Sequence, residues 1–393
     1  MDETAIAEGT RPVYRDTNLH IVFGVTLMAV LGVSSITPAF PRIVEELGIS
    51  PQAVGSLITV FTLPGVFLTA FLGVLADQFG RKRILVPALL LFAIAGCACA
   101  FARDFRLLLL LRFLQGAGAA GLGAMNVTII GDLYTGQERA AAMGCNSSVL
   151  SVGTASYPAI GGALATLGWF YPFLLPLAAI PVAVAVLFSL DSPEPRRPQD
   201  FRQYLADAWM VMANRRVGAL FAVGTLTFIL YYGSYLAYFP LLISGTFGVS
   251  LFVVGLIVSV ASVATALASS QSGRLAGMFS GRALIGASCL LYAVPLVAIP
   301  MVSSLWLYLI PVSIFGVAQG INMPSQMALL AEQAPMEQRG AMMSVNGMVL
   351  RLGQTLGPLV MGVVLTMSGL NGVFFGGAVC AVVMLAVVLV VMN

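Results

Sequence analysis

The chain has 393 residues, of which 59% are hydrophobic and 9% are charged, and its net charge is +3. A water-soluble domain carries about a quarter charged residues, so this composition excludes a protein whose surface is mostly solvated. The cations are scattered over short loops, which argues against nucleic-acid binding. One histidine and five cysteines without paired spacing favour no metal site, cofactor or catalytic constellation, so no enzymatic activity is predicted.

Apolar segments of about 20 residues, the length that spans a bilayer, recur along the whole chain. The first is too long for a signal-peptide core and is expected to be retained. The fold class is therefore an all-α membrane protein. Twelve transmembrane helices are predicted, at residues 19–40, 52–76, 83–102, 107–131, 140–165, 169–190, 217–242, 250–276, 282–301, 304–330, 340–368 and 371–392.

The longest interval between these segments, residues 191–216, contains prolines, acids and five arginines. It divides the chain into a cytoplasmic segment (1–18), an N-terminal six-helix bundle (19–190), a cytoplasmic linker (191–216) and a C-terminal six-helix bundle (217–392). Residues 200–214 of the linker are expected to form an amphipathic helix on the membrane surface.

Lys and Arg in short loops favour the cytoplasmic side of a membrane. Placing both termini in the cytoplasm puts 14 of the 19 cations there and leaves only Arg42, Arg103 and Arg106 outside. A multi-pass protein of the inner (cytoplasmic) membrane is predicted. No basic tail follows the last helix, so a further C-terminal segment is an open expectation.

An internal repeat supports the two halves independently. Adding 200 to a residue number recovers the same motifs, and nine of the 24 positions between Arg139 and Gly162 are identical in the second copy. Asn146 and Pro158, for example, match Asn346 and Pro358. Two parallel six-helix halves are therefore predicted, with a substrate site near the midplane between them.

The turn between the second and third segments reads Gly73-x-x-x-Asp77-Gln78-x-Gly80-Arg81-Lys82. It resembles the signature loop G-x-x-x-D-R-x-G-R-[RK] of the major facilitator superfamily of secondary transporters, and departs from it at Gln78. The resemblance implies a gating role for Asp77 and Arg81. In the second copy Gly277 replaces the acid and Gly281 the arginine, so the two gates are not expected to be equivalent.

The fourth segment contains Arg112-x-x-Gln115-Gly-x-Gly-Ala-Ala, which resembles the family's helix 4 pattern R-x-x-Q-G-x-G-A-A. An arginine inside a helix is costly, so it is a functional candidate by default. Two interpretations are open for Arg112. It snorkels or holds carbonyl groups near the outer end, or it belongs to a coupling path with Gln115.

The fifth segment contains Gly153-Thr-Ala-Ser-Tyr157-Pro158-Ala-Ile-Gly161-Gly162. It resembles the motif G-x-x-x-G-P-x-x-G-G, which in this family marks exporters that exchange substrate for protons. The eleventh segment repeats the pair as Gly357-Pro358. Glycine and proline together also permit a bend and close packing, so both motifs are expected to act as packing kinks and in gating.

Arg351 lies about 12 residues into the eleventh segment, close to the expected bilayer centre. Asn346 precedes it, and Gln354 follows on nearly the same face. A buried cation without a partner is costly, so Arg351 is expected to face the cavity, a carbonyl group or an anion. Satisfaction by carbonyls and water, or contact with substrate, are both open.

All 16 acidic residues lie outside the helix centres. Asp132 and Glu332 are repeat mates at cytoplasmic helix ends, where they are expected to pair with the repeat mates Arg139 and Arg339. If protons are coupled, the carrier is one of Asp132, Asp77 and His20. A facilitator without coupling remains open.

Polar and aromatic residues within the segments are candidates for the substrate cavity. Tyr231, Tyr235 and Tyr238 are expected to share one helical face, which belongs either to the cavity or to an interfacial belt. The further candidates are Met28, Thr37, Asn126, Asn146, Gln319, Asn322, Gln326 and Asn346.

The chain resembles most the drug–proton antiporter branch of the superfamily. The resemblance implies multidrug-like efflux of small, mostly amphipathic molecules by alternating access, in exchange for protons. The alternative is an exporter or facilitator of a specific, anionic metabolite bound by Arg351. A membrane sensor or a scramblase-like protein is disfavoured by the duplicated loops. The expected partners are a small-molecule substrate, lipid and protons, with the protein as a monomer.

Overall fold

The computed structural model describes residues 13–191, 214–333 and 339–391, and its secondary structure there is entirely helical. The first part contains α1 (Thr17–Ser34), α2 (Phe40–Glu46), α3 (Pro51–Val54), α4 (Ser56–Phe79), α5 (Arg81–Cys99), α6 (Phe105–Leu133), α7 (Gly136–Leu167), η3 (Tyr171–Ala178) and α8 (Ala179–Ser189). The second contains α10 (Arg215–Ile229), η4 (Leu230–Tyr238), α11 (Phe239–Phe247), α12 (Leu251–Ser270), α13 (Ser272–Met278), α14 (Gly281–Ala298), α15 (Leu309–Gln333) and α16 (Arg339–Val391). Short 3-10 segments, η1 (Val13–Arg15), η2 (Thr37–Ala39), η5 (Ile299–Met301) and η6 (Leu305–Tyr308), join some of them.

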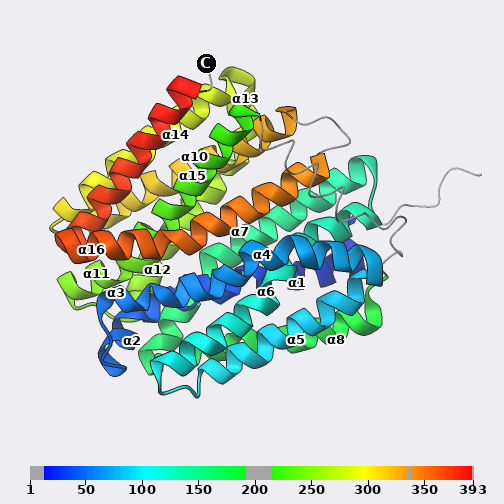
Figure 1. Ribbon diagram of the computed structural model, residues 1–393, viewed down its shortest axis with the longest axis horizontal. Coiled ribbons are helices and arrows are strands. Elements are labelled where there is room, and N and C mark those ends of the chain that lie inside the picture. Colours follow the sequence, from blue (N-terminus) through cyan, green and yellow to red (C-terminus); the bar gives the residue numbers. More distant parts are fainter. Residues whose placement is uncertain (1–12, 192–213, 334–338, 392–393) are drawn as a thin grey trace, which may run out of the picture.

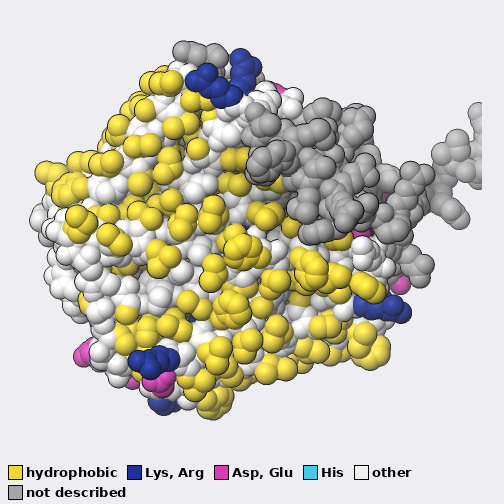
Figure 2. Space-filling model, in the orientation of Figure 1, with side chains coloured by type: hydrophobic (Ala, Val, Ile, Leu, Met, Phe, Trp, Pro, Cys, Tyr) yellow, Lys and Arg dark blue, Asp and Glu magenta, His cyan; other side chains and the backbone are white. Residues whose placement is uncertain are grey.

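Ten segments of the described chain are long and apolar enough to cross a membrane. Figure 2 shows the corresponding surface, a broad hydrophobic face with charged side chains near its edges. Two differences explain why ten segments are found where twelve were predicted. Helix α7 is not among the ten, and α16 counts once although Gly369 (φ 73°, ψ −177°) interrupts its helical backbone. The chain is therefore a multi-span helical membrane protein, while the arrangement of twelve spans in two bundles stays a prediction.

The internal repeat reappears in the local structure. Gly48 and Gly248 both have φ near +59°, a left-handed conformation that glycine adopts without strain. Two residues later Ser50 and Ser250 cap the following helices by accepting hydrogen bonds from backbone N–H groups. The same sequence thus builds the same turn and helix start at two places 200 residues apart.

The helices form two groups by contact. Helix α6 packs against α4 and α5, and α1 packs against α7; in the second group α15 packs against α12 and α14, and α10 packs against α16. Only a few pairs join the groups, above all α4 with α16 and α7 with α12. In Figure 1 the groups converge at the end that carries α2, α3 and α11 and diverge toward the opposite end.

Several predicted helices are not regular, and the seventh and eighth are examples. The seventh, predicted over 217–242, changes from α10 into a π-helix, η4, before α11 continues to Phe247. The eighth, predicted over 250–276, breaks at Gln271 into α12 and α13. The amphipathic helix predicted over residues 200–214 falls almost entirely outside the described residues.

Candidate functional site

The first contact between the two groups is a seam of small residues between α4 and α16. Thr59 Oγ1 donates to the carbonyl oxygen of Thr355 at 3.0 Å, and the hydroxyls of Thr62 and Thr355 are 2.9 Å apart. A Cβ atom at Gly55 would lie 3.0 Å from Pro358 Cβ. These contacts bring the two backbones close together at the end of the molecule where the groups converge.

The second seam joins α7 to α12. A Cβ atom at Gly162 would lie 2.3 Å from the carbonyl oxygen of Leu251, and one at Gly255 would lie 2.1 Å from that of Pro158. Because no side chain fits at such distances, glycine is required at both positions. Part of the predicted helix 5 motif therefore lies between the groups, whereas Gly153 packs within the first group against Leu27.

Arg351 extends from α16 toward the first group. A Cβ atom at Gly65 of α4 would lie 3.1 Å from Arg351 Cδ, and one at Gly123 of α6 would lie 3.6 Å from Arg351 Nη2. Arg351 Nη1 donates to Gln354 Oε1 at 3.0 Å, as the spacing of the two residues indicates. No ion pair of Arg351 is found among the described residues.

Three polar side chains of the first group form one buried network. Thr26 Oγ1 on α1 donates to Asn146 Oδ1 on α7 at 2.6 Å, and Asn126 Nδ2 on α6 donates to Thr26 Oγ1 at 2.9 Å. Among the described residues, the buried Oδ1 atom of Asn126 has no hydrogen-bond partner. The network therefore brings together two predicted residues and leaves this acceptor unused.

The second group has a comparable network around Thr227. Its hydroxyl accepts from Asn322 Nδ2 at 2.9 Å and from Gln326 Nε2 at 3.5 Å, and Ser288 Oγ donates to Asn322 Oδ1 at 3.1 Å. Gln319 accepts a hydrogen bond from Tyr292. These polar groups are used within the second group, so Gln319 and Asn322 connect α10, α14 and α15.

Asn346 stands apart from that network, although its repeat mate Asn146 lies within the first one. Among the described residues, its Nδ2 donates only a weak contact, at 3.6 Å, to Met327 Sδ. Asn346 therefore retains hydrogen-bonding capacity on the helix that also carries Arg351 and Gln354.

The three predicted tyrosines lie in the π-helix η4. Tyr231 and Tyr235 share a face, because their ring centroids are 5.8 Å apart and both rings stack on Phe315 of α15. Tyr235 and Tyr238 are fully buried, and their hydroxyls donate to the carbonyl oxygens of Val258 and Pro358. Their role in the cavity or in an interfacial belt stays a prediction. Met28 is likewise buried in the apolar core.

Arg112 is fully buried, so it does not snorkel. Its Nη1 donates to Gln115 Oε1 at 2.6 Å, its Nε donates to the Leu57 carbonyl at 3.2 Å, and the Phe61 ring lies 4.1 Å from the guanidinium carbon. Holding a carbonyl group, one of the two interpretations, is what the contacts support. Its coupling role stays a prediction.

The signature loop forms a charged cluster at the divergent end. Arg81 forms ion pairs with Asp77 and, through Nε at 3.1 Å, with Asp132 on α6. The predicted pairing of Asp132 with Arg139 is wrong for these described residues, because Arg139 lies against Gly131 and Arg81 occupies the carboxylate. Glu332 is exposed, and the side chain of Arg339 lies outside the described part.

The glycine–proline pair of the eleventh segment holds helices together within the second group. A Cβ atom at Gly357 would lie 2.9 Å from the Ile229 carbonyl, and Pro358 accepts from Tyr238 through its own carbonyl. Four threonines with buried hydrogen bonds were not among the predicted site residues: Thr26, Thr227, Thr62 and Thr355. Thr227 lies one position after the residue that the repeat pairs with Thr26. This near match is the one sequence signal that could have indicated these two threonines.

Glycine-lined seams, buried polar networks and a cation between two groups of membrane helices define a membrane transport protein. The profile of the Major Facilitator Superfamily matches residues 22–252 and 221–393. The chain belongs to this superfamily. It is a transporter by family, not an enzyme.

The relatives of this chain include an exporter and a multidrug resistance protein. The chain is 26% identical to the bacillibactin exporter of Bacillus subtilis over 95% of both chains, and 25% identical to multidrug resistance protein 2 of the same organism over 90% of both. A solved bacterial homologue of the lysosomal transporter Spinster superposes with a TM-score of 0.81 at 18% identity, covering 98% of each chain. This structural likeness supports the fold.

Proposed function

We propose that this protein is a secondary active exporter that moves small, mostly amphipathic organic molecules by alternating access. Its membership of the superfamily, and full-length similarity to an exporter and a multidrug resistance protein, support export. In this proposal residues 19–190 and 217–392 are two six-helix bundles joined by 191–216, and both termini are cytoplasmic. The two seams close one side of the membrane while the divergent end opens to the other.

The observation that carries the recognition of substrate is the position of Arg351. The guanidinium lies between α16 of one group and Gly65 and Gly123 of the other, with Gln354 as its hydrogen-bond acceptor among the described residues. A cation in an apolar environment attracts an anion or several acceptor atoms. Arg351, Gln354 and Asn346 are therefore proposed to contact an anionic or acceptor-rich part of the substrate, with Asn126 and Asn146 opposite them.

Proton exchange is proposed to use acids at the divergent end, because no described acid lies near Arg351. Asp132 and Asp77 share Arg81, so protonation of one carboxylate would release part of this cluster. His20 is less suited, because its Nδ1 lies 2.9 Å from the Asp16 carbonyl at the start of α1 and it is not part of the Arg81 cluster among the described residues.

The same observation favours a second candidate, an exporter or facilitator of a specific anionic metabolite without proton coupling. Here Arg351 would select the substrate and the charged cluster would act only in gating. Both candidates use the same site, and they differ in their dependence on a proton gradient.

The test uses purified protein in proteoliposomes with an imposed pH gradient. One lipophilic cationic dye and one organic anion are followed, with and without a protonophore, for wild type, Arg351→Gln and Asp132→Asn. Gradient-driven movement of the dye supports the multidrug exporter. Movement of the anion alone, unaffected by protonophore, supports the second candidate.

Arg351→Gln is expected to reduce transport of acceptor-rich or anionic substrates about tenfold or more, the size of a lost charge-assisted hydrogen bond. Arg106→Gln is the matched control, because this exposed residue carries the same charge at the start of α6. Equal transport by wild type and Arg351→Gln for every substrate would remove Arg351 from the site.

A further inference from the structure

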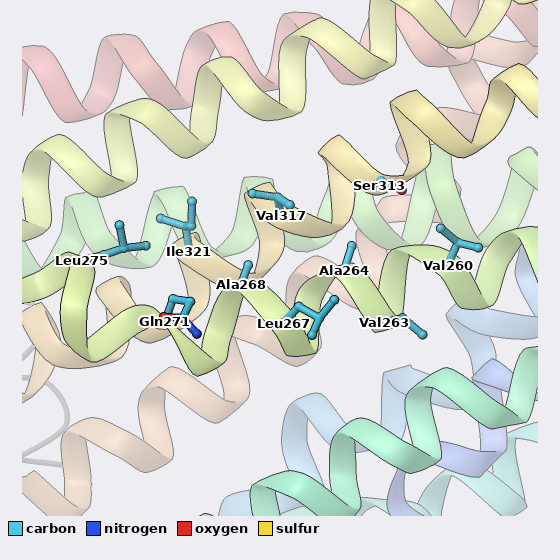
Figure 3. A pocket seen from close by; sticks show the side chains of 10 residues that line it. All are labelled: Val260, Val263, Ala264, Leu267, Ala268, Gln271, Leu275, Ser313, Val317 and Ile321. Carbon is cyan, nitrogen blue, oxygen red and sulfur yellow. The ribbon is translucent and has the colours of Figure 1, made fainter.

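An open groove runs along the outer side of α12 and α15, away from the seams. Its volume is about 520 Å³, within the range of roughly 300–1,000 Å³ that small-molecule sites occupy. Figure 3 shows that its side chains come from these two neighbouring helices and from α13, which carries Leu275. The walls are almost entirely apolar, including Val263 and Leu267 on α12 and Val317 and Ile321 on α15.

The groove faces away from the other group of helices. On α12, Gly255 packs against Pro158 of α7, whereas the side chains of Val263 and Leu267 are 48% and 66% exposed. Helix α12 is apolar enough to span a membrane. Its exposed apolar side chains, and the groove beside them, therefore contact lipid rather than water or the proposed substrate path.

One end of the groove is polar and positively charged. Gln271 lines this end, and Arg274 Nη1 donates to Gln271 Oε1 at 3.1 Å. Arg274 is exposed and forms no ion pair among the described residues. The sequence contains no Asp or Glu from residue 208 to residue 331, so no acid of this stretch neutralises it. A cation beside an apolar groove complements a ligand with an anionic head and an apolar chain.

We propose that the groove binds one anionic phospholipid, with an acyl chain along α12 and α15 and its phosphate at Arg274. The lining residues on α12 and α13 run from Val260 to Leu275, roughly 22 Å of helical rise. One leaflet of hydrocarbon is about 15 Å thick, half of the bilayer core, so the groove is long enough for a chain that reaches the headgroup level. The lipid is a bound ligand and is distinct from the transported substrate.

The experiment is native mass spectrometry of the purified full-length protein, with graded amounts of phosphatidylglycerol or of phosphatidylcholine with the same acyl chains. Wild type is expected to retain one phosphatidylglycerol about fivefold more tightly than phosphatidylcholine, the effect of one basic residue near a membrane surface. Arg274→Gln is expected to abolish that preference. Val317→Trp, which fills the groove, is expected to weaken binding of both lipids.

Arg83→Gln is the matched control, because this exposed arginine lies at the start of α5 outside the groove. It is expected to leave the preference unchanged. Equal binding of the two lipids by wild type would overturn the anionic ligand, and an equal loss in Arg83→Gln would overturn the location. Retention of tight binding by both Arg274→Gln and Val317→Trp would overturn the site itself. A thermal unfolding scan without added lipid identifies any variant that fails to fold.

Discussion

Arg112 and Arg351 both lie within membrane helices, but protein encloses only Arg112. The Arg112 side chain is fully buried among Phe61, Gln115 and the Leu57 carbonyl, and its Nη2 atom has no hydrogen-bond partner among the described residues. Arg351 is half-buried and has one acceptor. The first cation is held for structural reasons, and the second has N–H groups left to offer to a ligand.

Replacement of Arg112 by leucine is expected to destabilise the protein, because the Leu57 carbonyl and Gln115 lose their donor. The expected loss is about 1–3 kcal/mol, the cost of leaving buried polar groups without a partner. The measurement is thermal unfolding in detergent, with Arg106→Leu as a control at an exposed position. Substrate-driven proton flux, measured beside it, tests coupling separately. An unchanged unfolding temperature with lost flux would contradict the structural role.

Tyr134 offers a second test at the end of α6. Its hydroxyl donates to Asp16 Oδ2 at 2.5 Å and so ties α6 to the capping residue of α1. Burial, followed by the hydrogen bond to Asp16, raises the pKa of the phenol above its usual value of 10.0. Folding thus favours the protonated hydroxyl, and this stabilisation is complete below about pH 10 and is lost as pH rises through the raised pKa.

Tyr134→Phe is therefore expected to lower the free energy of unfolding by about 1.5–3 kcal/mol at pH 7, the range for a hydrogen bond to a charged group. The difference from wild type should stay constant up to about pH 10 and narrow above it. Chemical unfolding at several pH values measures both. A difference that grows above pH 10 would show that the hydroxyl is not the stabilising group.

At the scale of elements, glycine positions decide how closely the two groups of helices approach. Gly162 of α7 lies against the backbone of α12, whereas no described residue lies within 4 Å of a Cβ atom added to Gly144 on the same helix. The two positions receive the same substitution in very different surroundings, which makes them a matched pair.

Gly162→Ala is expected to reduce transport at least tenfold, because its Cβ would lie 2.3 Å from the Leu251 carbonyl and the helices would have to separate. Gly144→Ala should transport like wild type. The measurement is the initial transport rate in proteoliposomes at equal protein content. If both variants transport equally well, the α7–α12 seam is not needed to close the protein.

The sequence predicted elements better than it predicted their partners. The left-handed turns at Gly48 and Gly248 and the serine caps after them follow from the repeat. The π-helix at Leu230–Tyr238 could not be predicted from the sequence, because the spacing of apolar and aromatic residues is similar in α- and π-helices. The partner of Asp132 could not be predicted from the sequence either. Asp132 pairs with Arg81, which lies 51 positions away. Side-chain pairing depends on how the helices meet.

At the scale of the whole molecule, the two seams lie where the groups of helices converge. Among the described residues few hydrogen bonds cross them, and in the α4–α16 seam these are Thr59 with Thr355 and Thr62 with Thr355. Glycine and threonine allow backbones to approach without large interdigitating side chains. Such an interface can separate at modest cost, which alternating access requires.

A reversible crosslink across the α4–α16 seam tests that motion. The hydroxyl oxygens of Thr62 and Thr355 are 2.9 Å apart, so thiols at these positions come within reach of each other. Oxidised Thr62→Cys/Thr355→Cys protein is expected to lose transport and to regain it on reduction, because the groups can no longer separate at this end.

Each single-cysteine variant keeps the five native cysteines and should be insensitive to oxidant. Substrate binding to the crosslinked protein should persist, because the site opens at the divergent end. Full transport by the crosslinked protein, verified by mass spectrometry, would mean that this seam stays closed through the cycle and that the halves move in another way.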